Sequence, residues 1–210
     1  MILGFHTDIE FRETTRKGFI GLAFNYRRGP AIVNSLAPNL IIPIALVVLL
    51  LTGCNHVESP ENELSAMTQE VSQEFEDVSH ISTSDLAIWL AAPNREAPIL
   101  LDVREPLEYA VSHLPGAIRV APDSTAEQII AMIDPSRPIV LYCSVGYRSS
   151  VLARRLVSQG AKQTKNLEGS IFKWANEGRP LVRDSGFTRL VHPYDDSYGR
   201  MLLEEYRSYR

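Results

Sequence analysis

Short apolar segments alternate with segments of helical periodicity from residue 78 onward, and this alternation limits the fold more than any other feature of the chain. Apolar runs of about four to eight residues between turn residues are typical of buried strands. Strands separated by helices form βαβ units, in which the strands are parallel and helices cover both faces of the sheet. The sequence therefore predicts an α/β domain built on a parallel sheet.

The expected elements follow one another without long interruptions. Strands are expected at residues 78–81, 98–103, 117–121, 138–142 and 165–167. Helices are expected at residues 86–90, 105–111, 125–133, 149–157 and 171–178. In such sheets ligands bind at the carboxyl ends of the strands. Cys143 directly follows the strand at 138–142, so it is expected at that end.

The segment around Cys143 has the properties of an anion-binding loop that carries a nucleophile. Residues 143–148 lie between a buried strand and the start of a helix, where backbone N–H groups favour anions. A thiol pKa near ~8.5 falls at such a position, and the thiolate is the nucleophilic form. Gly146 permits a positive φ that points N–H groups inward, and Arg148 supplies a planar cation. The alternative interpretation of Cys143 is a buried, inert thiol.

Four groups of residues resemble the rhodanese family, in the order of that family, over roughly residues 78–182. They are Leu101-Asp102-Val103-Arg104-Glu105; Glu108-Tyr109 with Ser112-His113-Leu114-Pro115-Gly116-Ala117-Ile118; Tyr142-Cys143-Ser144-Val145-Gly146-Tyr147-Arg148-Ser149 with Ala153 and Leu156; and Leu167-Glu168-Gly169-Ser170 with Trp174 and Gly178-Arg179-Pro180. Each group alone is weak evidence of this resemblance, but the four groups in the order of the family make it specific.

The resemblance implies a rhodanese-like, five-stranded parallel sheet with helices on both faces. It also implies an enzyme of the thiosulfate sulfurtransferase class. A sulfane sulfur from thiosulfate, a polysulfide or a persulfide would become a persulfide on Cys143 and pass to a thiophilic acceptor. The expected partners are thus a small sulfur-containing anion and a thiol acceptor, with no cofactor. A module that binds or relays sulfur for a partner protein, without turnover, is the alternative.

The resemblance also assigns expected roles to the residues of the loop and of one neighbouring strand. Cys143 is expected to be catalytic. Substrate binding is expected from Ser144, Val145, Gly146, Tyr147, Arg148 and Ser149. Asp102 and Arg104 are expected to brace the loop by hydrogen bonds, and His113 is expected to pack in a turn. Tyr147 and Trp174 either flank the pocket or belong to the core.

Loop length separates two chemistries associated with this kind of loop. The pattern here is Cys-x4-Arg, whereas phosphatases and arsenate reductases resemble one another in a longer Cys-x5-Arg loop around a tetrahedral oxyanion. Ser149 occupies that sixth position here, which disfavours the phosphatase or arsenate reductase interpretation. Ser144 stands where several thiosulfate-using members of the family carry a basic residue, so the donor stays open.

Composition excludes several other classes of function. Lys and Arg number 21 against 25 Asp and Glu, so binding to nucleic acid has no compositional support. The two cysteines, Cys54 and Cys143, lie in such different contexts that no structural disulfide is expected. No Cys or His cluster has zinc spacing, so no metal site is expected.

Residues 40–51 form an apolar run that is shorter than the ~20 residues of a membrane span and fits a signal peptide. Arg27 and Arg28 precede it, as a basic region should. Residues 51–54, Leu-Thr-Gly-Cys, resemble the lipobox of bacterial lipoproteins. That resemblance implies lipidation of Cys54 and a membrane-anchored, extracytoplasmic protein on the periplasmic face or the cell surface. A buried helix or plain anchor with an incidental cysteine is the alternative.

These patterns divide the chain into four parts. Residues 1–53 are expected to be a signal peptide or leader, and residues 54–77 a lipidated N-terminus with an acidic, flexible tether that lacks Lys and Arg. Residues 78–183 are expected to form the rhodanese-like domain. Residues 184–210 are predicted to be a C-terminal helical extension, because Tyr198, Leu202, Tyr206 and Tyr209 have near-helical spacing. This extension could also serve as a lid or a partner surface.

Replacing Cys54 by alanine is expected to abolish lipid attachment. Stable anchoring needs at least two acyl chains, and the diacylglycerol implied by the lipobox provides two. Cells expressing wild type and Cys54→Ala would be labelled with a palmitate analogue and compared by gel mobility. An unlabelled wild type of full 210-residue mass would identify a plain anchor and an incidental cysteine.

Overall fold

The computed structural model describes residues 59–210. The expected leader at residues 1–53, the expected lipidation site Cys54 and the first residues of the expected tether lie outside the described residues. None of the helices described from residue 59 onward combines the length and the hydropathy that crossing a membrane requires.

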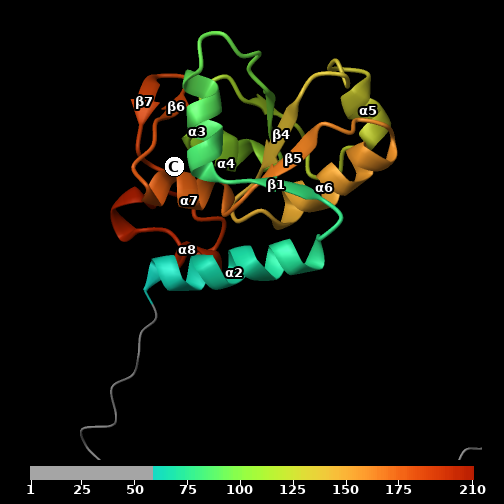
Figure 1. Cartoon of the computed structure of the whole chain (residues 1–210). Coiled ribbons are helices and arrows are strands. Elements are labelled where there is room, and N and C mark those ends of the chain that lie inside the picture. Colours follow the sequence, from blue (N-terminus) through green and yellow to red (C-terminus); the bar gives the residue numbers. More distant parts are fainter. Residues whose placement is uncertain (1–58) are drawn as a thin grey trace, which may run out of the picture. The chain divides into compact units, whose positions relative to one another are not determined.

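A five-stranded parallel sheet lies at the centre of the domain, with strand order β1-β5-β4-β2-β3 (Figure 1). The strands are β1 (Ser79–Ile81), β2 (Ile99–Asp102), β3 (Ile118–Arg119), β4 (Ile139–Tyr142) and β5 (Thr164–Leu167). The prediction of an α/β fold with five parallel strands and helices on both faces is confirmed. A separate antiparallel pair, which the sequence analysis did not predict, consists of β6 (Leu181–Arg183) and β7 (Gly186–Thr188).

Five helices lie close to their expected positions in the sheet domain. They are α3 (Thr83–Ala91), α4 (Pro106–Val111), α5 (Ala126–Ile130), α6 (Tyr147–Ser158) and α7 (Ser170–Asn176). The structure also has helices α2 (Pro60–Glu74) and α8 (Asp196–Gly199) and the 3-10 helix η2 (Glu204–Tyr206), which depart from the expected organisation. Ser82 caps α3 by accepting the N–H of Asp85, a local signal visible in the sequence.

Strand β4 is buried on both faces and contributes to two hydrophobic clusters. Successive side chains of a strand point to opposite faces of the sheet. Ile139 and Leu141 pack in the cluster that contains residues of α5 and α6, while Val140 and Tyr142 pack with residues of α3 and α7. Because β4 is a central strand, the residue that follows it, Cys143, lies in the middle of the carboxyl edge of the sheet.

Residues 60–74 form a helix, so the prediction of a flexible tether is wrong for this stretch. The Oγ of Ser59 caps α2 by accepting the N–H of Asn62. Leu64, Val71 and Phe75 are buried, and their helical spacing gives α2 an apolar face within an otherwise acidic segment. The acidic composition of the segment suggested a tether, but burial of these three apolar side chains is enough to pack the helix on the domain.

Residues 184–210 do not form the predicted helical extension. Apart from α8 and η2, the segment consists of extended chain and turns. Backbone hydrogen bonds between residues far apart in the segment hold it in this conformation. The N–H of Val191 donates to the carbonyl of Tyr206, and the N–H of Ser208 donates to the carbonyl of Val191. Leu202 is fully buried, in the same cluster as Leu64 of α2. The two ends of the described chain therefore pack on each other, as Figure 1 shows for α2 and α8.

Replacing Phe75 by alanine is expected to lower the free energy of unfolding by about 3 kcal/mol, because a buried aromatic ring leaves a cavity. Phe75 is 2% exposed, and its ring meets that of Tyr147 edge-on with centroids 5.3 Å apart. Phe187→Ala is the matched control, since Phe187 is 84% exposed and should change the value by less than ~0.5 kcal/mol. Urea unfolding of both variants measures this difference, and equal effects would show that α2 is not integral to the fold.

Candidate active site

The loop after β4 turns sharply into α6 at Gly146. Gly146 has φ 111° and is the N-cap of α6. A side chain there would be strained, and its Cβ would lie 3.2 Å from Nδ2 of Asn166. The N–H of Gly146 donates to Sγ of Cys143 at 3.2 Å. The glycine thus lets the backbone fold back far enough to place an N–H on the sulfur.

The N-terminus of α7 holds the backbone of Cys143 from the other side. The N–H of Cys143 donates to Oγ of Ser170 at 3.2 Å, and this hydroxyl donates to the carbonyl of Leu167. The N–H of Ile171 donates to the carbonyl of Cys143 at 3.2 Å. Ser170 adopts a positive φ of 50°, which places its hydroxyl under the loop. Both backbone groups of the nucleophile are therefore satisfied by α7.

Opposing effects act on the pKa of the Cys143 thiol. Burial raises the pKa, because Cys143 is only 1% exposed and the charged form loses solvation. The charge of Arg148, the hydroxyl and N–H of Ser149 and the N–H of Gly146 favour the thiolate, and together they hold the pKa below the ordinary thiol value. The sulfur is therefore more readily ionised than a free cysteine, although it is buried.

Glu108 of α4 forms a bidentate ion pair with Arg148. Nη1 and Nη2 of Arg148 donate to the two carboxylate oxygens of Glu108, each at 2.8 Å. Nη2 also donates to Oγ of Ser144 at 3.0 Å, and that hydroxyl donates to Oε1 of Glu108 at 2.9 Å. Burial raises the pKa of Glu108, but the hydrogen bonds and charge of Arg148 outweigh it and hold the pKa below its usual value. Glu108 is thus an ionised carboxylate beside the loop.

A cavity of about 210 Å³ lies over the sulfur. It is lined by Cys143, Ser144, Val145, Tyr147, Arg148, Tyr194 and Tyr198. Five of these residues belong to the predicted loop, whereas Tyr194 and Tyr198 come from the C-terminal segment. A larger hollow of about 510 Å³ between α2 and α7 has no Cys or His in its lining and so offers no comparable nucleophile.

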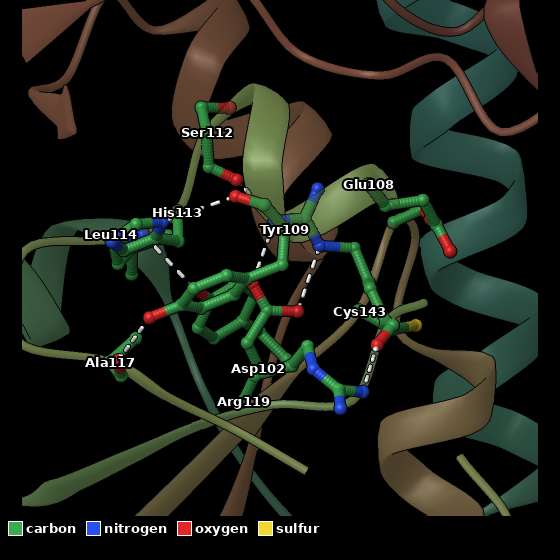
Figure 2. Close-up of polar contacts among 12 residues, drawn as sticks. Asp102, Glu108, Tyr109, Ser112, His113, Leu114, Ala117, Arg119 and Cys143 are labelled. Carbon is green, nitrogen blue, oxygen red and sulfur yellow. Dashed lines mark hydrogen bonds and ion pairs between the residues drawn. The ribbon is translucent and has the colours of Figure 1, made fainter. Parts of the chain in front are cut away.

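Asp102 and Arg104 form a fully buried ion pair. Nε and Nη2 of Arg104 donate to the two carboxylate oxygens of Asp102 at 2.8 and 2.6 Å, and Nη2 also donates to the carbonyl of Ser112. Figure 2 shows Glu108 and Cys143 to one side of Asp102. Neither Asp102 nor Arg104 lines the cavity, a placement that suits bracing rather than chemistry.

Two other predicted residues lie apart from the cavity. Ser149 is buried in α6, where its hydroxyl donates to Oδ1 of Asn166 at 2.6 Å and contacts the carbonyl of Gly146 at 3.2 Å. Trp174 belongs to the core, and its indole N–H donates to the carbonyl of Pro180. Ser149 therefore supports the loop through its contact with the carbonyl of Gly146 and does not line the cavity.

His113 packs in a turn, as the sequence analysis expected. Its ring stacks on that of Tyr109 with centroids 3.9 Å apart, and the hydroxyl of Tyr109 donates to the carbonyl of Ala117 (Figure 2). Within residues 59–210, no group of three or more His, Cys, Asp or Glu side chains is placed to hold a metal ion.

Three residues of the site had no predicted role, namely Glu108, Ser170 and Tyr194, whereas Tyr198 was expected only within the C-terminal extension, for which a lid was one alternative. Glu108 and Ser170 belong to two of the recognised motifs, so a signal for them existed although their partners could not be inferred. Tyr194 and Tyr198 had no such signal. They reach the loop only because the C-terminal segment folds back over the carboxyl edge of the sheet.

Removing the positive charge of Arg148 and removing the negative charge of Glu108 are expected to move the pKa of Cys143 in opposite directions. Arg148→Gln should raise the pKa, because it removes the cation that favours the thiolate, and Glu108→Gln should lower the pKa, because it removes an opposing anion. Below its pKa the thiol is protonated and reacts slowly, so the pH profile of iodoacetamide alkylation at the Cys143 peptide reports the shift by mass spectrometry. Shifts of the same sign in both variants would contradict this electrostatic account.

Comparison with known proteins identifies the region that contains this site. The rhodanese-like domain family matches residues 86–177. A sulfurtransferase of Allochromatium vinosum is 33% identical over 109 residues, which are 52% of this chain and 99% of that protein. A probable adenylyltransferase/sulfurtransferase of Mycobacterium tuberculosis is 32% identical over 104 residues, which are 49% of this chain but only 26% of that larger protein.

Among solved structures, a rhodanese-related protein from Thermoplasma volcanium is 26% identical. The match covers 50% of this chain and 97% of that one, with a TM-score of 0.42. Helix α2 and the segment that carries Tyr194 and Tyr198 lie outside residues 86–177.

Proposed function

This chain belongs to the rhodanese-like family, and from that premise we propose that it is a sulfurtransferase in which Cys143 carries the transferred sulfur. The observation that supports this role most directly is the position of the sulfur. Sγ of Cys143 lies at the base of a cavity, receives the N–H of Gly146 and has a lowered pKa. These are the conditions that a sulfur nucleophile requires.

In the first half-reaction, the thiolate of Cys143 attacks the sulfane sulfur of a donor. The Sγ–S bond forms as the bond between that sulfur and the rest of the donor breaks, and the leaving group takes the electron pair. With thiosulfate the products are the Cys143 persulfide and sulfite; with a persulfide the leaving group is a thiolate. No external oxidant or reductant is needed, because the sulfane sulfur moves between two sulfur atoms.

In the second half-reaction, a thiophilic acceptor attacks the outer sulfur of the persulfide. The S–S bond breaks and its electron pair returns to Sγ, which regenerates the thiolate. A thiol of lower pKa is a better leaving group in such exchanges. The interactions that lower the pKa of Cys143 therefore favour release of sulfur as well as its capture.

The dimensions of the loop support a sulfur atom over an oxyanion. Cys143 and Arg148 are separated by four residues, and α6 starts already at Tyr147, so the loop is short. The guanidinium is directed to Glu108 by two hydrogen bonds. Phosphatase or arsenate reductase chemistry is for this reason disfavoured.

We further propose that Cys54 is lipidated and holds the domain at an extracytoplasmic membrane surface. The support is the Leu-Thr-Gly-Cys pattern at residues 51–54, directly after an apolar run of signal-peptide length.

Cys143→Ser is expected to abolish sulfur transfer, because a serine hydroxyl is not ionised in this loop. The protein would be incubated with thiosulfate or a persulfide and its intact mass determined; the wild type should gain about 32 Da, one sulfur atom, before cyanide converts that sulfur to thiocyanate. Cys54→Ala, which removes the other cysteine, is the matched control and should retain both signals.

Thiocyanate formed by the serine variant would exclude Cys143 as the carrier. A wild type that gains one sulfur but forms thiocyanate only once would identify a relay module that requires a partner protein for turnover. Circular dichroism of the serine variant verifies that the fold is retained.

A further inference from the structure

Arg148, the cationic side chain in the site, already has hydrogen-bonding partners within the protein. Three hydrogen bonds from the guanidinium of Arg148 are directed to Glu108 and Ser144. One face of the guanidinium is covered as well, since the Tyr194 ring lies 4.9 Å from Cζ of Arg148. Arg148 is the one cationic side chain among the described residues that line the cavity. A donor entering this cavity therefore meets a cation whose charge is already paired with the carboxylate of Glu108.

The charges around the sulfur favour a donor without a large negative charge. The thiolate of Cys143 and the carboxylate of Glu108 contribute two negative charges against the single positive charge of Arg148. Glu108 is 2% exposed, so water screens its charge poorly. Thiosulfate is a dianion and would have to approach a thiolate in an environment that is already net negative. An uncharged donor avoids this repulsion.

The wall of the cavity is aromatic. Tyr194 and Tyr198 meet edge-on with ring centroids 5.3 Å apart, and Tyr147 completes the lining from α6. We call Tyr147, Tyr194 and Tyr198 the tyrosine collar. Aromatic rings of this arrangement bind apolar and aromatic groups through burial and edge-to-face contacts.

Tyr194 is held in the collar by a strained backbone. Its φ is 69°, unusual for a bulky residue, and its N–H donates to Nδ1 of His192 at 3.1 Å. The hydroxyl of Tyr147 donates to Glu74 of α2 at 2.9 Å. Strained residues are retained where the surrounding structure enforces them, frequently at ligand sites. Both ends of the described chain thus position the collar.

We propose that the sulfur donor is an uncharged hydropersulfide, R–S–SH, whose organic group is small and apolar or aromatic, and that Tyr194 and Tyr198 determine this specificity. The proposal rests on the sulfurtransferase function proposed above. A cavity of about 210 Å³ is smaller than the ~300–1,000 Å³ of drug-sized ligand sites, which limits R to a group of about one ring.

The proposed step is balanced without a further reagent. The Cys143 thiolate attacks the terminal sulfur of R–S–SH, the Sγ–S bond forms, and the S–S bond of the donor breaks. The electron pair leaves on R–S⁻, and the proton stays on the transferred sulfur, so that Cys143–S–SH results. The negative charge moves from Sγ to the sulfur of the leaving thiolate R–S⁻. The tyrosine collar contacts the organic group R of that thiolate.

The test compares rates of sulfur uptake on Cys143 by intact mass for two donors, thiosulfate and benzyl hydropersulfide generated in solution. Each rate is divided by the rate of the same donor with N-acetylcysteine, which removes differences in intrinsic reactivity. We expect the normalised rate for benzyl hydropersulfide to be about 100-fold higher, the effect of one like charge at close range.

Variants of the collar then separate specificity from stability. Tyr194→Ala and Tyr198→Ala should each lower the ratio of the benzyl hydropersulfide rate to the thiosulfate rate by about three- to tenfold, the size of one aromatic contact. Tyr194→Phe and Tyr198→Phe keep the rings and should change this ratio much less than the alanine variants, which controls for misfolding. Phe187→Ala, an exposed aromatic that does not line the cavity, should change neither rate.

Removing the opposing anion tests the electrostatic part of the argument. Glu108→Gln should raise the thiosulfate rate by about tenfold or more, because Arg148 then carries an uncompensated charge. Equal normalised rates for the two donors, or collar variants that slow both donors alike, would overturn the donor assignment. Absence of any sulfur on Cys143 with either donor would instead overturn the proposed function itself.

Discussion

The ion pair between Glu108 and Arg148 is the interaction on which the site depends. It joins α4 to the first turn of α6, on either side of the loop that carries Cys143. A partly buried ion pair is stable only when its hydrogen-bonding groups are satisfied, and here the hydroxyl of Ser144 closes the network. The pair therefore orients the guanidinium and at the same time limits the charge that it offers to a ligand. Arg148 also favours the thiolate of Cys143, so the pKa of the thiol and the proposed donor preference both depend in part on this arrangement.

The site is completed by parts of the chain that lie outside the region matched by the rhodanese-like family. Helix α2 holds Tyr147 through Glu74, and the C-terminal segment contributes Tyr194 and Tyr198. These two parts also pack on each other through Leu64 and Leu202. The loop that carries Cys143 thus belongs to the region matched by the family, whereas Tyr194 and Tyr198 of the aromatic wall lie outside it.

Most of the sheet domain was predictable because its signals are local. The apolar runs around Leu100 and Val140 correspond to strands, and Gly160, which follows α6, has a positive φ of 97°, as is typical of a glycine that ends a helix. The two errors have a common cause. The segment at residues 60–75 was predicted to be a tether because it is acidic, although it has three apolar side chains at helical spacing. The segment after residue 190 was predicted to be helical because its tyrosines have near-helical spacing, although long-range backbone pairing holds it in another conformation. In both cases tertiary contacts outweighed the local pattern.

The sequence by itself determined the class of the fold, the position of Cys143 at the carboxyl end of a central strand, and the short spacing between Cys143 and Arg148. These properties depend on periodicity and on distances along the chain. Only the tertiary structure decided which group neutralises Arg148, which hydroxyl supports the backbone of Cys143, and which rings cover the sulfur. Glu108, Ser170 and Tyr194 are separated from Cys143 by tens of residues. Their contacts depend on how helices and loops pack at the edge of the sheet, and a single sequence does not specify those contacts.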